Sequence, residues 1–339
     1  MLAFLLNSGC AWWLLPPTAL PATVLPTSLS PIEQPVTLIS LAGPLVSPSA
    51  ELSGMAWYGD WLILLPQYPS QFGNQLFALH KQDVVDFLTG KNQTPLSPFS
   101  IPFIDVGIQE QTLIFNGYEG ITFIGDRVYL TVEAIFGTGG TGYLVAGSIA
   151  PDLTEIRLDT TQVTSIPPQA SLPNLSDETI VAVGDQLATI YEANGRFVNA
   201  EPVVHFFDST TLEPVGILPL ATIEYRVTDG TAIDSLGRFW VVNYFYPGDR
   251  ALSSILRSRG ATGTIDASAQ PIERLLELQF TTEGVIRTAT PPLSLELLAD
   301  NVARNWEGIV HLQAEGLDGF LLVTDSFPET LFAFVPKLP

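Results

Sequence analysis

Residues 117–133 read GYEGITFIGDRVYLTVE. Two apolar runs of strand-forming residues flank the pair Gly125-Asp126, and a Gly-Asp pair between such runs is typical of a tight β-hairpin turn. The acid-glycine pair Glu119-Gly120 precedes the first run, and a second acid, Glu133, ends the second run. The segment therefore predicts a hairpin that begins and ends with a carboxylate.

The same pattern occurs four more times along the chain. The other copies are SGMAWYGDWLILLPQ (53–67), ETIVAVGDQLATIYE (178–192), DGTAIDSLGRFWVVN (229–243) and EGIVHLQAEGLDGFLLVTD (307–325). The first residue and the closing polar residue are 14 positions apart in four copies and 18 apart in the fifth, where the turn is longer. Successive copies begin 66, 59, 51 and 78 residues apart. Self-similarity at such long periods indicates a repeat architecture.

Each interval leaves room for the hairpin and two further strands, and four strands per repeat form the blade of a β-propeller. We therefore expect an all-β fold over residues 36–339, a propeller of five four-stranded antiparallel blades. Only 32 residues follow Glu307, too few for a complete blade, so residues 36–48 are expected to supply an N-terminal outer strand that closes the ring. A sixth blade around residues 255–290 is the alternative.

The chain is strongly acidic. Its 339 residues include 35 Asp and Glu, 14 Lys and Arg, three His and one Cys, and the formal net charge at pH 7 is −21. This charge repels the phosphates of DNA and RNA, so no nucleic-acid partner is expected, whereas cations are natural partners. The scarcity of imidazole and thiol groups leaves oxygen ligands, which favour calcium over zinc.

The N-terminal residues differ in composition from the rest. Residues 1–15, MLAFLLNSGCAWWLL, are apolar but too short to span a membrane, and residues 5–10 resemble a bacterial lipobox with Asn7 where leucine is usual. Residues 16–35 carry six prolines and are expected to form an extended tether. We predict an exported monomer, periplasmic or held at the cell envelope, with membrane contact only through a lipid anchor at Cys10. An unmodified apolar start is the alternative.

The hairpin spacing predicts where the polar residues meet. In a propeller the innermost strand of each blade lines the central channel, and the second strand of its hairpin returns beside it. Both polar positions of each copy should therefore lie at one mouth of the channel. The inner set is Ser53, Glu119, Glu178, Asp229 and Glu307, and the outer set is Gln67, Glu133, Glu192, Asn243 and Asp325. Seven of these ten residues are carboxylates, and such crowding is costly unless protons or a cation neutralise it.

We predict that the inner set binds one central Ca²⁺, which takes roughly six to eight oxygen ligands at flexible geometry, whereas Mg²⁺ requires a tighter octahedron. The alternative is that these acids cap strand ends and accept hydrogen bonds from glycine amides of neighbouring blades. Arg226 and Arg304 each stand three residues before an inner acid. They are expected either to bind an anionic group of a substrate or to pair with the ring carboxylates. Glu133 or Glu192 is the predicted general base.

The segments GYEGITFIGDRVYLTVE (117–133) and RNWEGIVHL (304–312) resemble the phytase-like domain family, which is named for an esterase-like activity, and are similar to the SdiA-regulated propeller proteins. The inner set also resembles that of the calcium-activated nucleotidases (apyrases), five-bladed propellers with a central calcium. This chain has Asp229 where the nucleotidases tend to have serine, and it lacks their basic substrate-binding segments. The resemblance implies a calcium ion on the inner set and an ester or phosphoester hydrolase.

Two functions remain open at this point. The first is a calcium-dependent hydrolase of a small ester or phosphoester, although the net charge of −21 repels an anionic substrate. The second is a non-catalytic binding or scaffold propeller at the cell envelope, with calcium as a structural ion. The glycine-rich residues 137–142 lack the lysine of a P-loop and are expected to form a flexible loop over the channel mouth.

Overall fold

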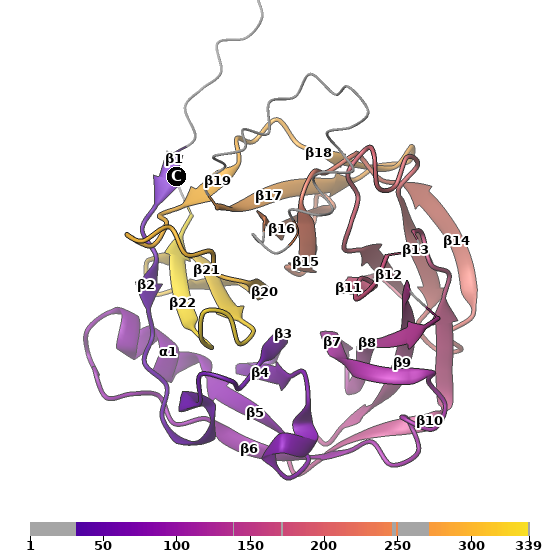
Figure 1. The fold of residues 1–339 in the computed structure, drawn as a ribbon. Coiled ribbons are helices and arrows are strands. Elements are labelled where there is room, and N and C mark those ends of the chain that lie inside the picture. The colour runs from indigo at the N-terminus through magenta and orange to yellow at the C-terminus, as the bar shows by residue number, and fades with distance from the viewer. Residues whose placement is uncertain (1–31, 138, 171, 246–248, 250–270, 338–339) are drawn as a thin grey trace, which may run out of the picture. The chain divides into compact units, whose positions relative to one another are not determined.

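Five blades of mainly antiparallel strands surround a central axis in residues 31–339, the second of the two units into which the chain divides (Figure 1). The computed structural model describes residues 32–137, 139–170, 172–245, 249 and 271–337. The predictions for residues 1–15, including Cys10, and for residues 16–31 lie outside the described residues. Within the described part of the chain, no helix is long and apolar enough to cross a lipid bilayer.

Each blade begins with its innermost strand and ends at the outside of the ring. Blade 1 contains β3 (Leu52–Tyr58), β4 (Trp61–Pro66), β5 (Gln75–His80) and β6 (Phe99–Ile104). Blade 2 contains β7 (Ile114–Ile124), β8 (Arg127–Phe136), β9 (Gly139–Ile149) and β10 (Ile156–Ile166). Blade 3 contains β11 (Asp177–Val183), β12 (Gln186–Tyr191), β13 (Val203–Asp208) and β14 (Pro214–Pro219).

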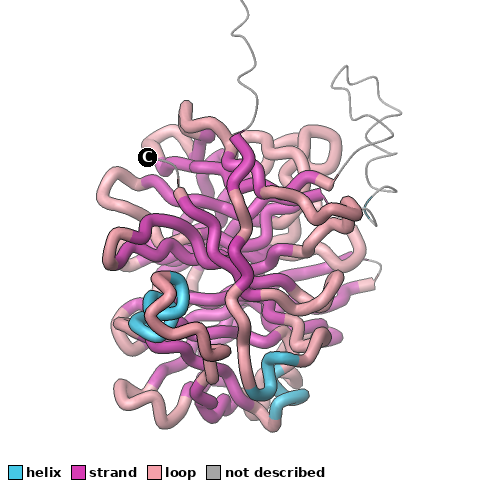
Figure 2. The backbone as a smooth tube through the Cα atoms, turned by 90° about the vertical axis from the view of Figure 1, so that its left-hand side faces the viewer, coloured by secondary structure: helices cyan, strands magenta, loops and turns pink. Residues whose placement is uncertain are grey.

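Blades 4 and 5 take strands from both ends of the chain. Blade 4 contains β15 (Arg226–Gly230), β16 (Arg238–Phe245), β17 (Ile272–Phe280), β18 (Val285–Arg287), β19 (Leu293–Leu295) and β1 (Ile32–Gln34). Blade 5 contains β20 (Trp306–Ala314), β21 (Leu317–Thr324), β22 (Phe332–Pro336) and β2 (Thr37–Leu38). Outside the sheets lie the helix α1 (Lys81–Leu88) and the 3₁₀ helices η1 (Gly43–Val46) and η2 (Pro69–Phe72) (Figure 2).

The prediction of a five-bladed ring closed by the N-terminal segment is confirmed. β2 pairs with β22, Thr37 opposite Phe334, so the chain start completes the last blade. The longest interval between hairpin copies, from residue 229 to residue 307, is where a sixth blade was the alternative. Its described residues after β16 form β17, β18 and β19, which belong to blade 4 and not to a separate blade. The end of the expected tether also joins a sheet, because β1 pairs in parallel with β19. The sheet structure therefore begins at Ile32, before the predicted boundary at residue 36.

The strand sequences explain why the blades pack as a ring. Successive side chains of a strand point to opposite faces, and both faces of a blade contact another blade. In β4, Leu62 and Leu64 enter an apolar cluster shared with blade 5, whereas Ile63 and Leu65 enter a cluster shared with blade 2. Three further clusters lie between blades 2 and 3, 3 and 4, and 4 and 5. Strands that are apolar on both faces thus fill five inter-blade cores.

The predicted hairpin turns are present, but the predicted glycine-rich loop is not. Gly59, Gly125 and Gly184 have φ angles of +59°, +58° and +64°, the left-handed region that glycine adopts without strain. By contrast, the glycines from 139 onward belong to β9. A Cβ on Gly140 would lie 2.3 Å from the carbonyl oxygen of Leu175, so glycine at this position permits a close approach to blade 3.

Candidate functional site

A β-bulge interrupts each of the five innermost hairpins at the predicted inner position. The register shifts lie between Leu52 and Gly54, Tyr118 and Ile121, Asp177 and Thr179, Val227 and Gly230, and Trp306 and Gly308. Side chains of a regular blade strand point towards the two neighbouring blades, whereas a bulged residue is re-aimed. The bulge therefore explains how a polar side chain at these positions leaves the apolar inter-blade layer.

Glycine after the inner residue permits the close approach of the innermost strands. A Cβ on Gly54 would lie 2.7 Å from the carbonyl oxygen of Glu119, and a Cβ on Gly120 would lie 2.3 Å from that of Glu178. Both distances are shorter than a real Cβ contact. A glycine after the inner residue therefore indicates that the backbones of neighbouring blades are crowded around the axis.

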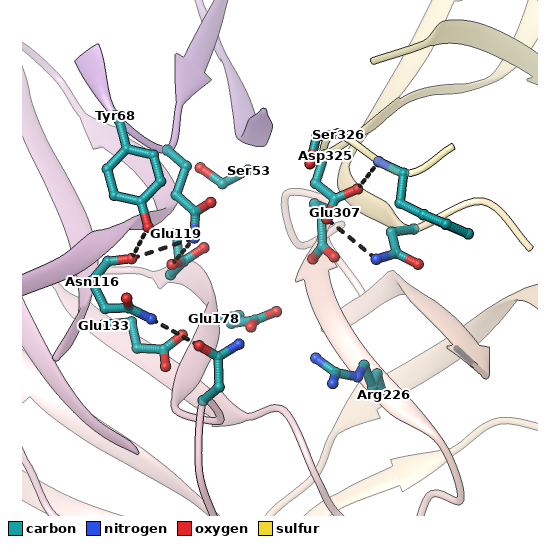
Figure 3. A pocket seen from close by; sticks show the side chains of 14 residues that line it. Ser53, Tyr68, Asn116, Glu119, Glu133, Glu178, Arg226, Glu307, Asp325 and Ser326 are labelled. Atoms are coloured by element: carbon teal, nitrogen blue, oxygen red, sulfur yellow. Dashed lines mark hydrogen bonds between the residues drawn. The ribbon is translucent and has the colours of Figure 1, made fainter. Parts of the chain in front are cut away.

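A cavity of about 410 Å³ lies at the mouth where these strands begin (Figure 3). All five blades contribute to its wall. The lining residues are Ser53, Gln67, Tyr68, Asn116, Glu119, Glu133, Asn174, Glu178, Arg226, Asn305, Glu307, Asp325, Ser326 and Phe327. Figure 3 shows the carboxylates of Glu119, Glu133, Glu178 and Glu307 pointing into one shared space. The sequence prediction that distant acids converge at one mouth therefore holds for these residues.

Four of the five predicted metal ligands line the cavity, and Asp229 does not. Its Oδ2 accepts a hydrogen bond of 2.8 Å from the amide of Ile309 in blade 5, and its Oδ1 accepts one of 2.8 Å from Gly230. Asp229 is buried and joins two blades, which is the strand-capping role that the sequence left open. Ser53 does line the cavity, but its hydroxyl donates to the carbonyl of Tyr118 at 2.6 Å.

Three of the five outer positions line the same cavity. The Gln67 side-chain amide donates a hydrogen bond to Glu119 Oε1 at 2.9 Å. Glu133, in the same blade as Glu119, also lines the cavity. Asp325 accepts a hydrogen bond from the backbone amide of Phe327 at 2.6 Å. Asn243 instead has a structural role, because its side-chain amide donates to two backbone carbonyls and its Oδ1 accepts from Arg274 Nε at 2.7 Å.

Glu192 and Arg226 form one ion-paired unit at the wall of the cavity. Glu192 is fully buried, does not line the cavity and accepts a hydrogen bond from the guanidinium of Arg226. Arg226 also makes two hydrogen bonds to Asp249, of 2.6 and 2.7 Å. Its positive charge is therefore shared by two carboxylates. Glu192 does not reach the cavity as a general base would, which corrects the prediction for that residue.

Arg304 is not at the site, so the prediction that it binds substrate is wrong. Its side chain is 3% exposed and pairs with Glu273 at 2.8 Å. The same carboxylate accepts a hydrogen bond from the Trp306 indole at 2.6 Å. This network ties the segment before β20 to β17. A buried, fully paired guanidinium cannot contact a ligand in the cavity.

Electrostatics in the cavity favour the neutral forms of its acids. Burial raises the pKa of Glu119, Glu178 and Glu307 well above the ordinary value of 4.5, and repulsion from neighbouring carboxylates raises it further. Burial and the charge of Glu192 raise the pKa of Glu133 to about 7. The site therefore binds protons unless a cation takes their place.

The cavity offers carboxylate oxygens of the kind that a calcium ion needs. Glu133 Oε1 and Glu178 Oε2 are buried without a hydrogen-bond partner, and hard carboxylate oxygens without donors are the ligands that Ca²⁺ prefers. Across the described ranges, however, no three His, Cys, Asp or Glu side chains lie close enough together to form a finished metal site. The residue types fit calcium, and binding requires the carboxylates to move closer together or water to bridge between them and the ion.

Sequence reasoning missed the asparagines of the wall and the two residues that follow Asp325, whereas Tyr68 directly follows the predicted position Gln67. Tyr68 donates to the Asn116 carbonyl at 2.8 Å, and the Asn116 amide donates to Asn174 at 2.9 Å. Ser326 and Phe327 follow Asp325 and complete the opposite side. Asn116 stands three residues before Glu119, outside the repeated segment, so the spacing that identified the acids gave no signal for it.

No protein-family model matches the chain, and no curated protein is significantly similar to it. Solved structures do resemble the fold. An exo-β-1,3-galactanase from Clostridium thermocellum is 10% identical with a TM-score of 0.50, and the match covers 88% of this chain and 61% of that one. A structure of the GH130 family of mannoside phosphorylases is 9% identical with a TM-score of 0.50, covering 93% of this chain and 97% of that one. At such low identity the likeness shows the fold alone.

Proposed function

We propose that the chain is a calcium-binding propeller that hydrolyses a small ester or phosphoester at the axial cavity. The observation that carries this proposal is that five carboxylates from three blades line one cavity, and two of them keep buried oxygens without a hydrogen-bond partner. Carboxylates crowded in this way favour a divalent cation as their counter-charge. Export and a monomeric state, expected from the sequence, belong to the same proposal.

The roles of the chain's own residues follow from their positions. Glu119, Glu178 and Glu307 would hold the ion, which when bound polarises a scissile carbonyl or phosphoryl group and lowers the pKa of a water ligand. Glu133 lines the cavity with a pKa near 7, so it can accept a proton at neutral pH. Glu192 acts as a positioning residue, because it orients Arg226 at the wall.

The charge of the cavity selects among substrates. Among the described residues of the lining, Arg226 is the one basic side chain, and Glu192 and Asp249 already balance its charge. A dianionic phosphomonoester would therefore meet a site whose positive charge comes from the bound ion alone. A neutral carboxyl ester or a phosphodiester of lower charge is the better substrate by this argument.

Hydrolysis of a glycosidic bond is a second candidate, favoured by the neutral polar lining. Tyr68, Asn116 and Asn174 offer hydroxyl and amide groups of the kind that bind sugar hydroxyls, and an uncharged sugar is not repelled by the acids. A carboxyl group with a raised pKa beside an ionised one can serve as the acid of a glycoside hydrolase. The galactanase named above shares the fold, which makes this chemistry worth testing.

A substrate panel separates these proposals. The full chain is assayed on chromogenic carboxyl esters, phosphomonoesters, phosphodiesters and glycosides, in calcium and in chelator. We expect calcium-dependent turnover of an ester that Glu119→Gln and Glu133→Gln each reduce at least about 100-fold, whereas the exposed control Glu283→Gln keeps it. Turnover of a glycoside that persists in chelator supports the second candidate instead. No turnover of any substrate, with a melting temperature that falls in chelator, contradicts both and leaves the scaffold propeller.

A further inference from the structure

A second cavity lies on the face of blade 2 that packs towards blade 3. Its volume is about 570 Å³, and its charged lining residues are Arg127, Arg157 and Asp159. This is the reverse of the axial cavity, where five acids face one arginine. In a chain with only 14 basic residues against 35 acids, two arginines at one cavity are a marked local exception.

Sheet register places the two arginines on the same face of blade 2, one on each side of Ser148. Ser148 of β9 lies directly opposite Arg127 of β8 and directly opposite Arg157 of β10. Residues opposite one another on neighbouring strands share a face of the sheet, with Cβ atoms about 5 Å apart. Arg127, Ser148 and Arg157 therefore form a row across three strands, with one guanidinium group on each side of the serine hydroxyl.

The neighbouring segments add further donors to this row. The register of β10 shifts between Leu158 and Val163, and this bulge carries Thr160 and Gln162 into the lining. Thr210 closes the cavity from the turn after β13 in blade 3. Hydroxyl groups beside paired guanidinium groups are the usual surroundings of a bound phosphate or sulfate.

Arg127 has hydrogen-bonding capacity to spare. Its Nη2 donates to Gln162 at 3.2 Å, its Nε is buried without a partner, and among the described residues it forms no ion pair. Asp159 interacts electrostatically with Arg127 but forms no direct ion pair with it, and Asp159 Oδ1 accepts from the amide and the hydroxyl of Thr161. Arg157 makes two hydrogen bonds to Glu155, of 3.2 and 3.1 Å, but both side chains are about half exposed, so solvent screens the pair and a bound anion can compete with Glu155.

We propose that this cavity is a binding site for a tetrahedral oxyanion, a phosphate or sulfate group of a small molecule, held by the forks of Arg127 and Arg157 around Ser148. The site lies at the end of β8 opposite to Glu133, so it is separate from the axial cavity. It does not depend on the proposed function, since no residue is shared between the two cavities.

Calorimetric titration of the full chain with inorganic phosphate, and separately with inorganic sulfate, tests the site. Chelator is present throughout, so that no phosphate binds through a metal ion at the axial cavity. We expect saturable binding of one ion, weakened about ten-fold or more by Arg127→Gln and by Arg157→Gln. Arg238→Gln, which removes the same charge from the exposed pair with Asp234 in blade 4, should leave the affinity unchanged.

Three results would overturn the proposal. These are no binding of either ion, binding that both glutamine variants retain, and binding that Arg226→Gln abolishes while Arg127→Gln does not, which would place the anion at the axis. Arg157 is exposed, so its variant keeps the test decisive even if Arg127→Gln fails to fold. Binding of phosphate but not sulfate, or the reverse, identifies which oxyanion the site accepts.

Discussion

Glu119 and Asp229 occupy equivalent positions in their hairpins, yet their surroundings give them different roles. One carboxylate oxygen of Glu119 accepts a hydrogen bond from Gln67, and the side chain lines the axial cavity. In contrast, both carboxylate oxygens of Asp229 accept hydrogen bonds from backbone amides. The shorter side chain of aspartate ends beside the backbone, within reach of the amides of Gly230 and Ile309. An acid at the repeated position therefore either lines the axial cavity or connects two blades, according to the length of its side chain.

Arg304 is expected to be structural, and its removal tests this. Arg304→Ala leaves Glu273 buried without its partner, so the free energy of unfolding should fall by about 3–5 kcal/mol. Arg238→Ala breaks an exposed pair and should change stability little. Denaturant unfolding of both variants measures the difference. A stable Arg304→Ala protein that has lost only its activity would return Arg304 to the catalytic set.

The raised pKa of Glu133 predicts how stability depends on pH in the metal-stripped protein. Because the pKa in the folded state is about 7 and the ordinary value is 4.5, the folded state binds the proton more tightly between these values. The free energy of unfolding should therefore fall as the pH rises from about 4.5 to about 7.

Substitution of that residue isolates its contribution. Glu133→Gln carries no charge at any pH, so above pH 7 it should be more stable than the original chain, and its loss of stability across this range should be smaller. Thermal melts in chelator, at several pH values, provide the comparison. A wild-type chain whose stability rises steadily between these pH values would contradict the raised pKa.

At the scale of single elements, the inner hairpin explains both the successes and the gaps of the sequence prediction. Turn glycines and apolar runs act locally, so the Gly-Asp turn and the two strands of 117–133 could be recognised from that segment alone. The bulge at Glu119 could not be recognised, because it depends on how closely the neighbouring blade approaches. Arg226 pairs with a ring carboxylate, Glu192, as one of the two sequence alternatives expected, but its second partner, Asp249, could not be predicted because it lies outside the repeated hairpins.

Glycine after the inner acid should be essential to this element. In Gly120→Ala the new Cβ would meet the carbonyl oxygen of Glu178 at 2.3 Å, so we expect a loss of stability of about 1–3 kcal/mol or more. Gly216→Ala in β14 is the matched control, because a Cβ there has nothing within 4 Å. Denaturant unfolding decides the matter. Equal stability of the two variants would show that the innermost strands are not crowded.

At the scale of the whole molecule, the ring follows from repetition and closure. Five hairpin copies in the sequence set the number of blades, and the pairing of β2 with β22 completes the fifth. The same ring gathers Glu119, Glu178 and Glu307 from separate blades at one mouth. The side chain at the repeated position reaches the cavity in some copies and not in others, according to its length and to its neighbours in the adjacent blades. The spacing of the copies in the sequence predicts neither of these.

A crystal structure of the full chain, grown in calcium, tests most directly whether these carboxylates together bind a divalent cation. We expect one anomalous peak in the axial cavity, about 2.3–2.6 Å from carboxylate oxygens of Glu119, Glu178 and Glu307. An axial cavity that stays free of calcium at a saturating concentration, with the three carboxylates turned away from one another, would contradict it.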